Sequence, residues 1–126
     1  MTISIQGVTF TYPGATTPVL RDLNLEVPQG AFLALIGNNG SGKTSLCKML
    51  TGIIPQFFQG DFSGTVLVNG YNILETRVAE LARQVGYVYQ DFENQLLKPR
   101  VLEDVAFAPL NFGLADYRQR AEAALE

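Results

Sequence analysis

The chain has 126 residues, of which 47% are hydrophobic and 17% are charged, and its net charge at pH 7 is −3. This composition is typical of one globular domain, and it shows no excess of positive charge, so we expect no nucleic acid among its partners. No histidine is present, which excludes sites that need imidazole. The single Cys47 cannot form an internal disulfide, and no apolar run approaches the roughly 20 residues of a membrane helix. Without a secretory signal at its N-terminus, the sequence predicts a soluble, cytoplasmic chain.

Three strands are predicted in the first part of the chain. Residues 2–12 carry apolar and aromatic side chains at strand spacing and end at a Pro-Gly turn. Residues 19–27 alternate, with Leu23 and Leu25 on the apolar face. Residues 31–36 are apolar on both faces, which predicts a central strand covered by helices on both sides.

A helix is predicted over residues 43–51, with Leu46, Cys47 and Leu50 as its buried stripe. Further along, the pattern predicts a loop over residues 54–63, a strand over 65–68 with a turn at 69–70, a helix over 75–84, a strand over 85–89, and helices from residue 101 that Pro109 and Gly113 interrupt, the last over 117–126. Whether Phe57 and Phe58 form an exposed contact or a local cluster is left open. The elements together indicate an α/β fold with an early antiparallel portion.

A glycine-rich segment joins the third predicted strand to the helix. Its residues fit G-x-x-x-x-G-K-[ST] at every fixed position: Gly37, Asn38, Asn39, Gly40, Ser41, Gly42, Lys43 and Thr44. Glycines let backbone N–H groups turn toward phosphate oxygens, and the helix adds unpaired donors and its positive end. Lys43 would reach the β- and γ-phosphates, and the Thr44 hydroxyl would hold Mg²⁺. The alternative is a glycine-rich turn with an exposed lysine.

With Ser45 included, this segment resembles the phosphate-binding loop of the ATP-binding subunits of ABC transporters. The resemblance covers nearly the whole chain and implies a P-loop NTPase fold: the antiparallel β portion, then a Walker A strand, loop and helix. It implies ATP and Mg²⁺ as cofactors. Tyr12 lies where the family keeps an aromatic residue that stacks on adenine; otherwise Tyr12 only ends a strand.

Residues 85–91 resemble the family's Q-loop. The resemblance implies that Gln90 helps to ligate Mg²⁺ and that a transmembrane subunit docks between Gln90 and Arg100. Asp91 is a candidate for the carboxylate that ends a Walker B strand. However, Gln90 separates it from the apolar run, and no glutamate follows it. We therefore do not assign Asp91 that role.

The following segments, residues 91–97 and 101–107, resemble the energy-coupling-factor branch, whose importers take up vitamins and transition-metal ions. Phe92 departs from the proline that is more common at this place. Fewer residues therefore support the assignment of branch and cargo than support the resemblance of the phosphate-binding loop. Cys47 is interpreted as a core residue rather than a reactive one.

The chain shows no Leu-Ser-Gly-Gly-Gln signature, no Walker B pair and no switch histidine, so we expect residues 1–126 to be a partial ATPase domain. For the full-length parent, the resemblance implies transport-coupled ATP hydrolysis, a second ATPase domain as partner, and a place at the inner face of the cell membrane. The chain alone would be a nucleotide-binding fragment or an interaction module without turnover, because hydrolysis needs more groups than the loop and Gln90 supply. A small P-loop kinase is a weaker alternative, since Arg77, Arg83 and Arg100 show no lid-like spacing. Missing strands beside residues 31–36 would leave sheet edges open, which predicts self-association.

Overall fold

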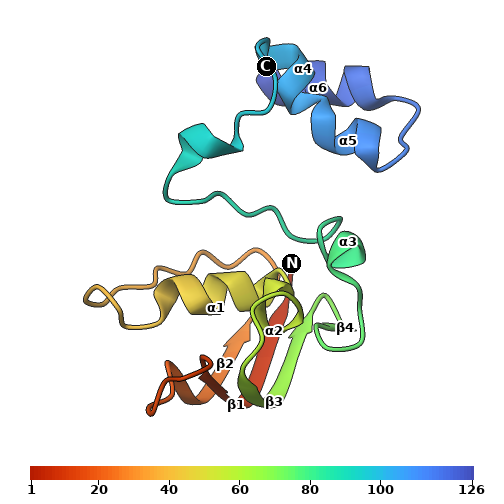
Figure 1. The fold of residues 1–126 in the computed structure, drawn as a ribbon. Helices are drawn as coiled ribbons and strands as arrows, with labels where there is room; N and C mark the ends of the chain where they lie inside the picture. The colour runs from red at the N-terminus through yellow and green to blue at the C-terminus, as the bar shows by residue number, and fades with distance from the viewer. The chain divides into compact units, whose positions relative to one another are not determined.

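The computed structural model describes all residues, Met1–Glu126, and they form two compact units, Met1–Tyr87 and Val88–Glu126. The first unit contains an antiparallel sheet of four strands in the order β2-β1-β3-β4. Its elements are β1 (Ile3–Thr11), β2 (Leu20–Val27), α1 (Lys43–Leu50), α2 (Ile53–Gln56), β3 (Asp61–Val68), β4 (Tyr71–Asn72) and α3 (Val78–Leu81) (Figure 1). The second unit contains a 3₁₀ helix (Phe92–Gln95), α4 (Val101–Val105), α5 (Phe107–Asn111) and α6 (Tyr117–Leu125). The early antiparallel portion predicted from the sequence is therefore confirmed.

Strand β1 lies between β2 and β3 and carries a bulge at its middle. Its pairing shifts between Ile5 and Val8 on the β2 side, and Gly7 at the bulge has a φ of 58°. The extra residue returns Val8 to the face that Ile5 occupies, and both side chains are buried. The Gly7 N–H, which the bulge takes out of the ladder, donates to the side-chain oxygen of Asn24 at 2.8 Å.

Helix α1 packs on the sheet and closes the core of the first unit. Its buried residues are Ser45, Leu46 and Met49, and the last two belong to the same cluster as the inward side chains of β1 and β3. Cys47 and Leu50 are only half-buried. The predicted stripe is thus correct for Leu46 but wrong for Cys47, because the face that meets the sheet follows the i, i+3 spacing from Leu46 to Met49.

The strands predicted at residues 31–36 and 85–89 do not form. Both segments lack ladder hydrogen bonds, and residues 31–36 are exposed throughout, with Phe32 at 98% and Ile36 at 93% exposure. An extended segment becomes a strand only when a neighbour pairs with its backbone, and neither segment is among the paired strands of the sheet. The predicted burial between helices is therefore wrong for this chain.

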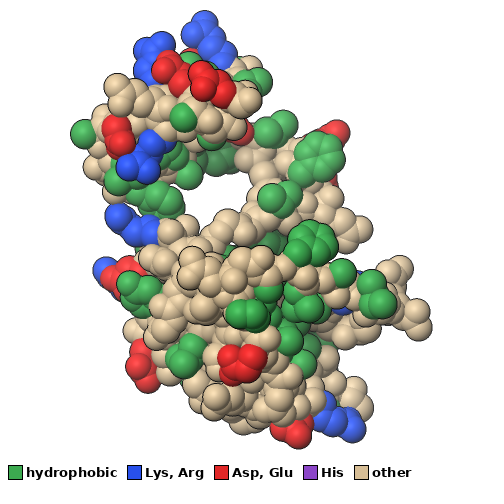
Figure 2. All heavy atoms as spheres, turned by 180° about the vertical axis from the view of Figure 1, so that it is seen from behind, with side chains coloured by type: hydrophobic (Ala, Val, Ile, Leu, Met, Phe, Trp, Pro, Cys, Tyr) green, Lys and Arg blue, Asp and Glu red, His purple; other side chains and the backbone are tan.

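The exposed segment places large apolar side chains in contact with solvent. Hydrophobic side chains reach the surface on the face drawn in Figure 2, where they are green. Contiguous exposed apolar area is uncommon on monomeric proteins. Self-association therefore stays a prediction, with these exposed side chains as its physical reason.

Other boundaries differ in smaller ways. The predicted loop over 54–63 contains α2 and the start of β3, which begins early because Phe62 pairs with Phe10. Within the helix predicted over 75–84, only Val78–Leu81 is α-helical. Pro109 does not interrupt α5, since it lies in the first turn, where its missing N–H costs little.

Candidate nucleotide-binding site

The glycine-rich loop leads directly into the N-terminus of α1. Residues 37–41 are exposed, and Gly42 is the N-cap in a left-handed conformation with φ 92°. The first N–H groups of a helix have no partner within it, and here no side chain caps them. The first turn also holds no acidic residue. The end of α1 therefore offers free donors and the positive end of the helix dipole to an anion.

Lys43 holds its ammonium group against the loop. Its Nζ donates to the carbonyl oxygens of Gly37 at 2.8 Å and Asn38 at 2.9 Å, and it lies 3.4 Å from the Ser41 hydroxyl. These bonds fold the loop around the ammonium group and place a full positive charge beside the helix terminus. The residues present fit a polyphosphate, which carries the opposite charge and accepts from both kinds of donor.

The loop is anchored where Gly42 meets the start of β2. A Cβ atom built on Gly42 would lie 2.8 Å from the carbonyl oxygen of Val19 and 3.1 Å from Cδ2 of Leu20. The missing side chain lets the N-terminus of α1 approach this strand closely. A hollow of about 240 Å³ adjoins the contact; its lining is mainly apolar and comprises Leu20, Leu23, Leu35, Ile36, Gly37, Ser41, Gly42, Lys43 and Leu46.

Tyr12, the candidate base-stacking residue, reaches the same end of α1. It follows directly after β1 and is half-buried, and its ring meets that of Phe10 edge-to-face at 4.9 Å between centroids. Its hydroxyl lies 3.0 Å from Oγ of Ser45, within hydrogen-bonding distance. The structure thus brings Tyr12 together with Ser45, one of the predicted site residues. The contact with Ser45 was not predicted, because no local pattern links residues 33 apart.

A model of the ABC transporter family matches residues 20–126, which include the loop, α1 and the whole second unit. The chain belongs to that family. The match identifies the ABC transporter family as a whole, and it does not show the energy-coupling-factor branch that the sequence suggests.

Individual ABC relatives agree with the family match. A protein of Pyrococcus abyssi is 46% identical over 112 residues, which make up 89% of this chain and 40% of the relative. A protein of Nitratidesulfovibrio vulgaris is 44% identical over 123 residues, which make up 96% of this chain and 43% of the relative. Both are provisionally named ABC transporter ATP-binding proteins. The chain spans about two-fifths of the length of these relatives.

The Q-loop glutamine predicted from the ABC resemblance lies in the second unit. Gln90 is exposed and precedes the 3₁₀ helix Phe92–Gln95. Asp91 accepts a hydrogen bond from the side chain of Asn94, which gives it a local role in this turn. Thr44 belongs to the first unit and is exposed on the first turn of α1. Joint ligation of Mg²⁺ by Thr44 and Gln90 stays a prediction.

The region predicted to meet a membrane subunit is apolar at its surface. Phe92, Leu96 and Leu97 are each at least 60% exposed. The carboxylate of Asp104 accepts from the backbone N–H groups of Leu97 at 2.7 Å and Lys98 at 2.9 Å, which fixes the turn that precedes α4. No helix of the structure combines the length and the apolar character needed to cross a membrane.

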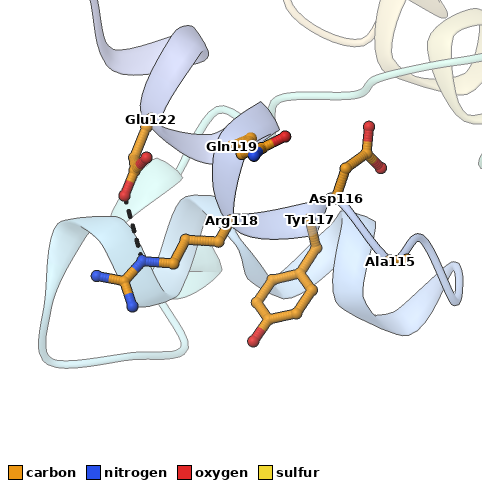
Figure 3. A pocket seen from close by; sticks show the side chains of 6 residues that line it. All are labelled: Ala115, Asp116, Tyr117, Arg118, Gln119 and Glu122. Atoms are coloured by element: carbon orange, nitrogen blue, oxygen red, sulfur yellow. Dashed lines mark hydrogen bonds and ion pairs between the residues drawn. The ribbon is translucent and has the colours of Figure 1, made fainter.

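A larger hollow, of about 650 Å³, lies at the start of α6 (Figure 3). Its charged side chains are engaged within the helix: Arg118 pairs with Glu122 at 3.2 Å, as the dashed line shows, and Asp116 pairs with Arg120 at 2.9 Å. The hydrogen bond from Arg120 holds the pKa of Asp116 below its ordinary value. These pairs are exposed, and exposed ion pairs of this kind contribute little to stability.

Proposed function

We propose that this chain binds the polyphosphate of ATP, as its Mg²⁺ complex, at the N-terminus of α1. The observation that supports the proposal is the uncapped first turn of α1, free of acidic residues, with the Lys43 ammonium group held beside it. A helix end with free N–H groups and a nearby cation selects anions, and a triphosphate offers several acceptor oxygens in a row.

The proposed roles follow the order of the loop. The nucleotide-binding residues are Tyr12, Gly37, Asn38, Asn39, Gly40, Ser41, Gly42, Lys43, Thr44 and Ser45. The backbone of the loop would surround the phosphates, and Lys43 would neutralise them. The Thr44 hydroxyl would hold Mg²⁺, which supplies further charge neutralisation when bound, and Gln90 is proposed as a second ligand on the family resemblance alone. Tyr12 would stack on the adenine base.

For the whole protein, we propose an ATPase that energises membrane transport, working with a second ATPase domain and a transmembrane subunit. The family match supports this role, and the exposed apolar side chains between Gln90 and Arg100 offer a surface for the transmembrane subunit. Such a protein would be peripheral, at the cytoplasmic face of the membrane. Import of a vitamin or a metal ion is the finer proposal, supported by the resemblance of residues 91–97 and 101–107.

For the 126-residue chain itself, we propose ATP binding without turnover. Phosphoryl transfer to water needs a group that orients the water and further charges around the γ-phosphate, in addition to a phosphate-binding loop. The chain would then act as a nucleotide-binding part of the larger ATPase. Hydrolysis by this chain that Lys43→Ala abolishes would contradict the proposal.

The test is calorimetric titration of the chain with MgATP, with Lys43→Ala beside the matched control Lys48→Ala. Both lysines lie on α1, but Lys48 is placed over the ring of Phe58, 4.7 Å from its centroid. Hydrogen bonds to charged groups contribute about 1.5–3 kcal/mol, so Lys43→Ala should weaken binding at least tenfold. The Lys48→Ala control should bind within about twofold of the unchanged chain, because the Lys48 ammonium group contacts the Phe58 ring and not the loop. Equal affinities for the two variants, or no binding by the unchanged chain, would refute the proposal.

A further inference from the structure

The hydrogen bond between Tyr12 and Ser45 joins the candidate base site to the phosphate-binding helix. The two oxygens lie 3.0 Å apart, and either can be the donor. Ser45 is in the first turn of α1, two residues after Lys43, and is only 7% exposed. Its hydroxyl is therefore directed to a protein partner instead of to water. Sequence reasoning had placed Ser45 among the nucleotide-binding residues without giving it a contact of its own.

Three restraints fix the Tyr12 ring. The edge-to-face contact with Phe10, with an angle of 76° between the ring planes, packs against the Tyr12 ring. The backbone carbonyl of Tyr12 accepts from the N–H of Ala15 at 3.0 Å, which closes the turn after β1. The Ser45 hydroxyl then holds the far end of the ring. Removing this last restraint would leave the half-buried ring, just beyond the end of its strand, held by the Phe10 contact alone and able to adopt other rotamers.

We propose that Ser45 is a positioning residue, which holds the Tyr12 ring in the orientation that a nucleotide base needs. The inference rests on the proposed function, because it concerns the same nucleotide site. Stacking on an aromatic ring requires the ring to present its face, so a ring fixed before the nucleotide arrives loses less entropy on binding. Recognition of the base then depends on a hydroxyl group of α1, the helix that binds the phosphates.

The experiment separates the base from the phosphates by using two ligands. Magnesium tripolyphosphate carries the phosphates without the base, so the ratio of MgATP affinity to tripolyphosphate affinity measures base recognition. The variants are Tyr12→Phe, which keeps the ring and removes its hydroxyl, Ser45→Ala, and the double variant. Tyr71→Phe is the matched control, since Tyr71 is an exposed tyrosine of β4. Thermal unfolding of each variant is followed by circular dichroism.

Each single variant should lower the affinity ratio by about three- to tenfold, the size of one net hydrogen bond. The double variant should lower it no further, because both changes remove the same bond. The Tyr71→Phe control should keep the ratio of the unchanged chain.

Several results would overturn the inference while leaving phosphate binding intact. These are an affinity ratio near one in the unchanged chain, an unchanged ratio in Tyr12→Phe, or additive effects in the double variant. Equal weakening of both ligands would also overturn it, since that pattern belongs to a direct phosphate contact of Ser45 or to a general structural role. An unchanged chain that binds neither ligand would remove the proposed function and this inference together.

Discussion

Replacement of Gly42 by alanine tests how tightly the phosphate-binding loop packs on the sheet. Gly42 has a φ of 92°, and a Cβ there would lie 2.8 Å from the Val19 carbonyl oxygen and 3.1 Å from a methyl group of Leu20. Gly40 has a similar φ of 82°, but a Cβ there meets nothing within 4 Å. The two alanine variants therefore share the conformational cost, about 1–2 kcal/mol for a left-handed backbone, and differ only in the collision.

The collision at Gly42 involves backbone, which cannot move aside as a flexible side chain can. Overpacking of this kind costs about 1–3 kcal/mol, so Gly42→Ala should lose that much more unfolding free energy than Gly40→Ala. With a urea m-value of about 1–3 kcal/mol/M, a difference of about 2 kcal/mol moves the midpoint by about 1 M. The assay is urea unfolding followed by circular dichroism, with equal m-values as the condition for comparison. Equal midpoints for the two variants would refute the close packing of α1 against the start of β2.

Three further changes test the core, the metal and a charge pair. Met49→Ala should lower the unfolding free energy by about 2–5 kcal/mol in thermal melts, because Met49 is fully buried on the face of α1 that meets the sheet. Cys47→Ala, at a half-buried position, should cost clearly less. The reverse order would contradict the observed face of the helix. Thr44→Val removes the proposed Mg²⁺ ligand and keeps the side-chain shape, so the difference between the ATP affinity with Mg²⁺ and that with a chelator should become smaller. An unchanged difference would argue against Thr44 as a ligand. Because a hydrogen bond from Arg120 lowers the pKa of Asp116, the stabilisation is present at neutral pH and is lost as the pH falls below about 3.9, the ordinary Asp value. Arg120→Gln should raise that pKa in an NMR titration, and an unmoved titration curve would show that the bond is not formed in solution.

The features that the sequence predicted well are local ones. The glycine-rich loop and the start of α1 form a contiguous segment, and glycine, lysine and the helix terminus act on one another over a few residues. The first strand was also predicted, but the bulge at Gly7, which accounts for the odd spacing from Ile5 to Val8, was not predicted and is seen only in the strand pairing. Short-range chemistry of this kind needs no knowledge of distant residues.

The strand predicted at residues 31–36, which does not form, depends on residues elsewhere in the chain. Apolar residues on both faces indicate a buried central strand, but strand formation depends on backbone partners that periodicity does not supply. The same limit applies to the helix stripe, where contact with the sheet buries Met49 and leaves Cys47 half-buried. Hydrophobicity fixes which side chains can be buried, and packing selects those that are.

The amino-acid sequence by itself thus predicted the proposed phosphate site, because Gly42, Lys43 and Thr44 would act through adjacent backbone and one helix end. The tertiary structure added a contact on the proposed base side of that site. It brought Tyr12, at the end of one strand, to the hydroxyl of Ser45 on α1, and it set Gly42 against the carbonyl oxygen of Val19. These contacts join residues far apart in the chain, and they exist only because the sheet and the helix share one hydrophobic core.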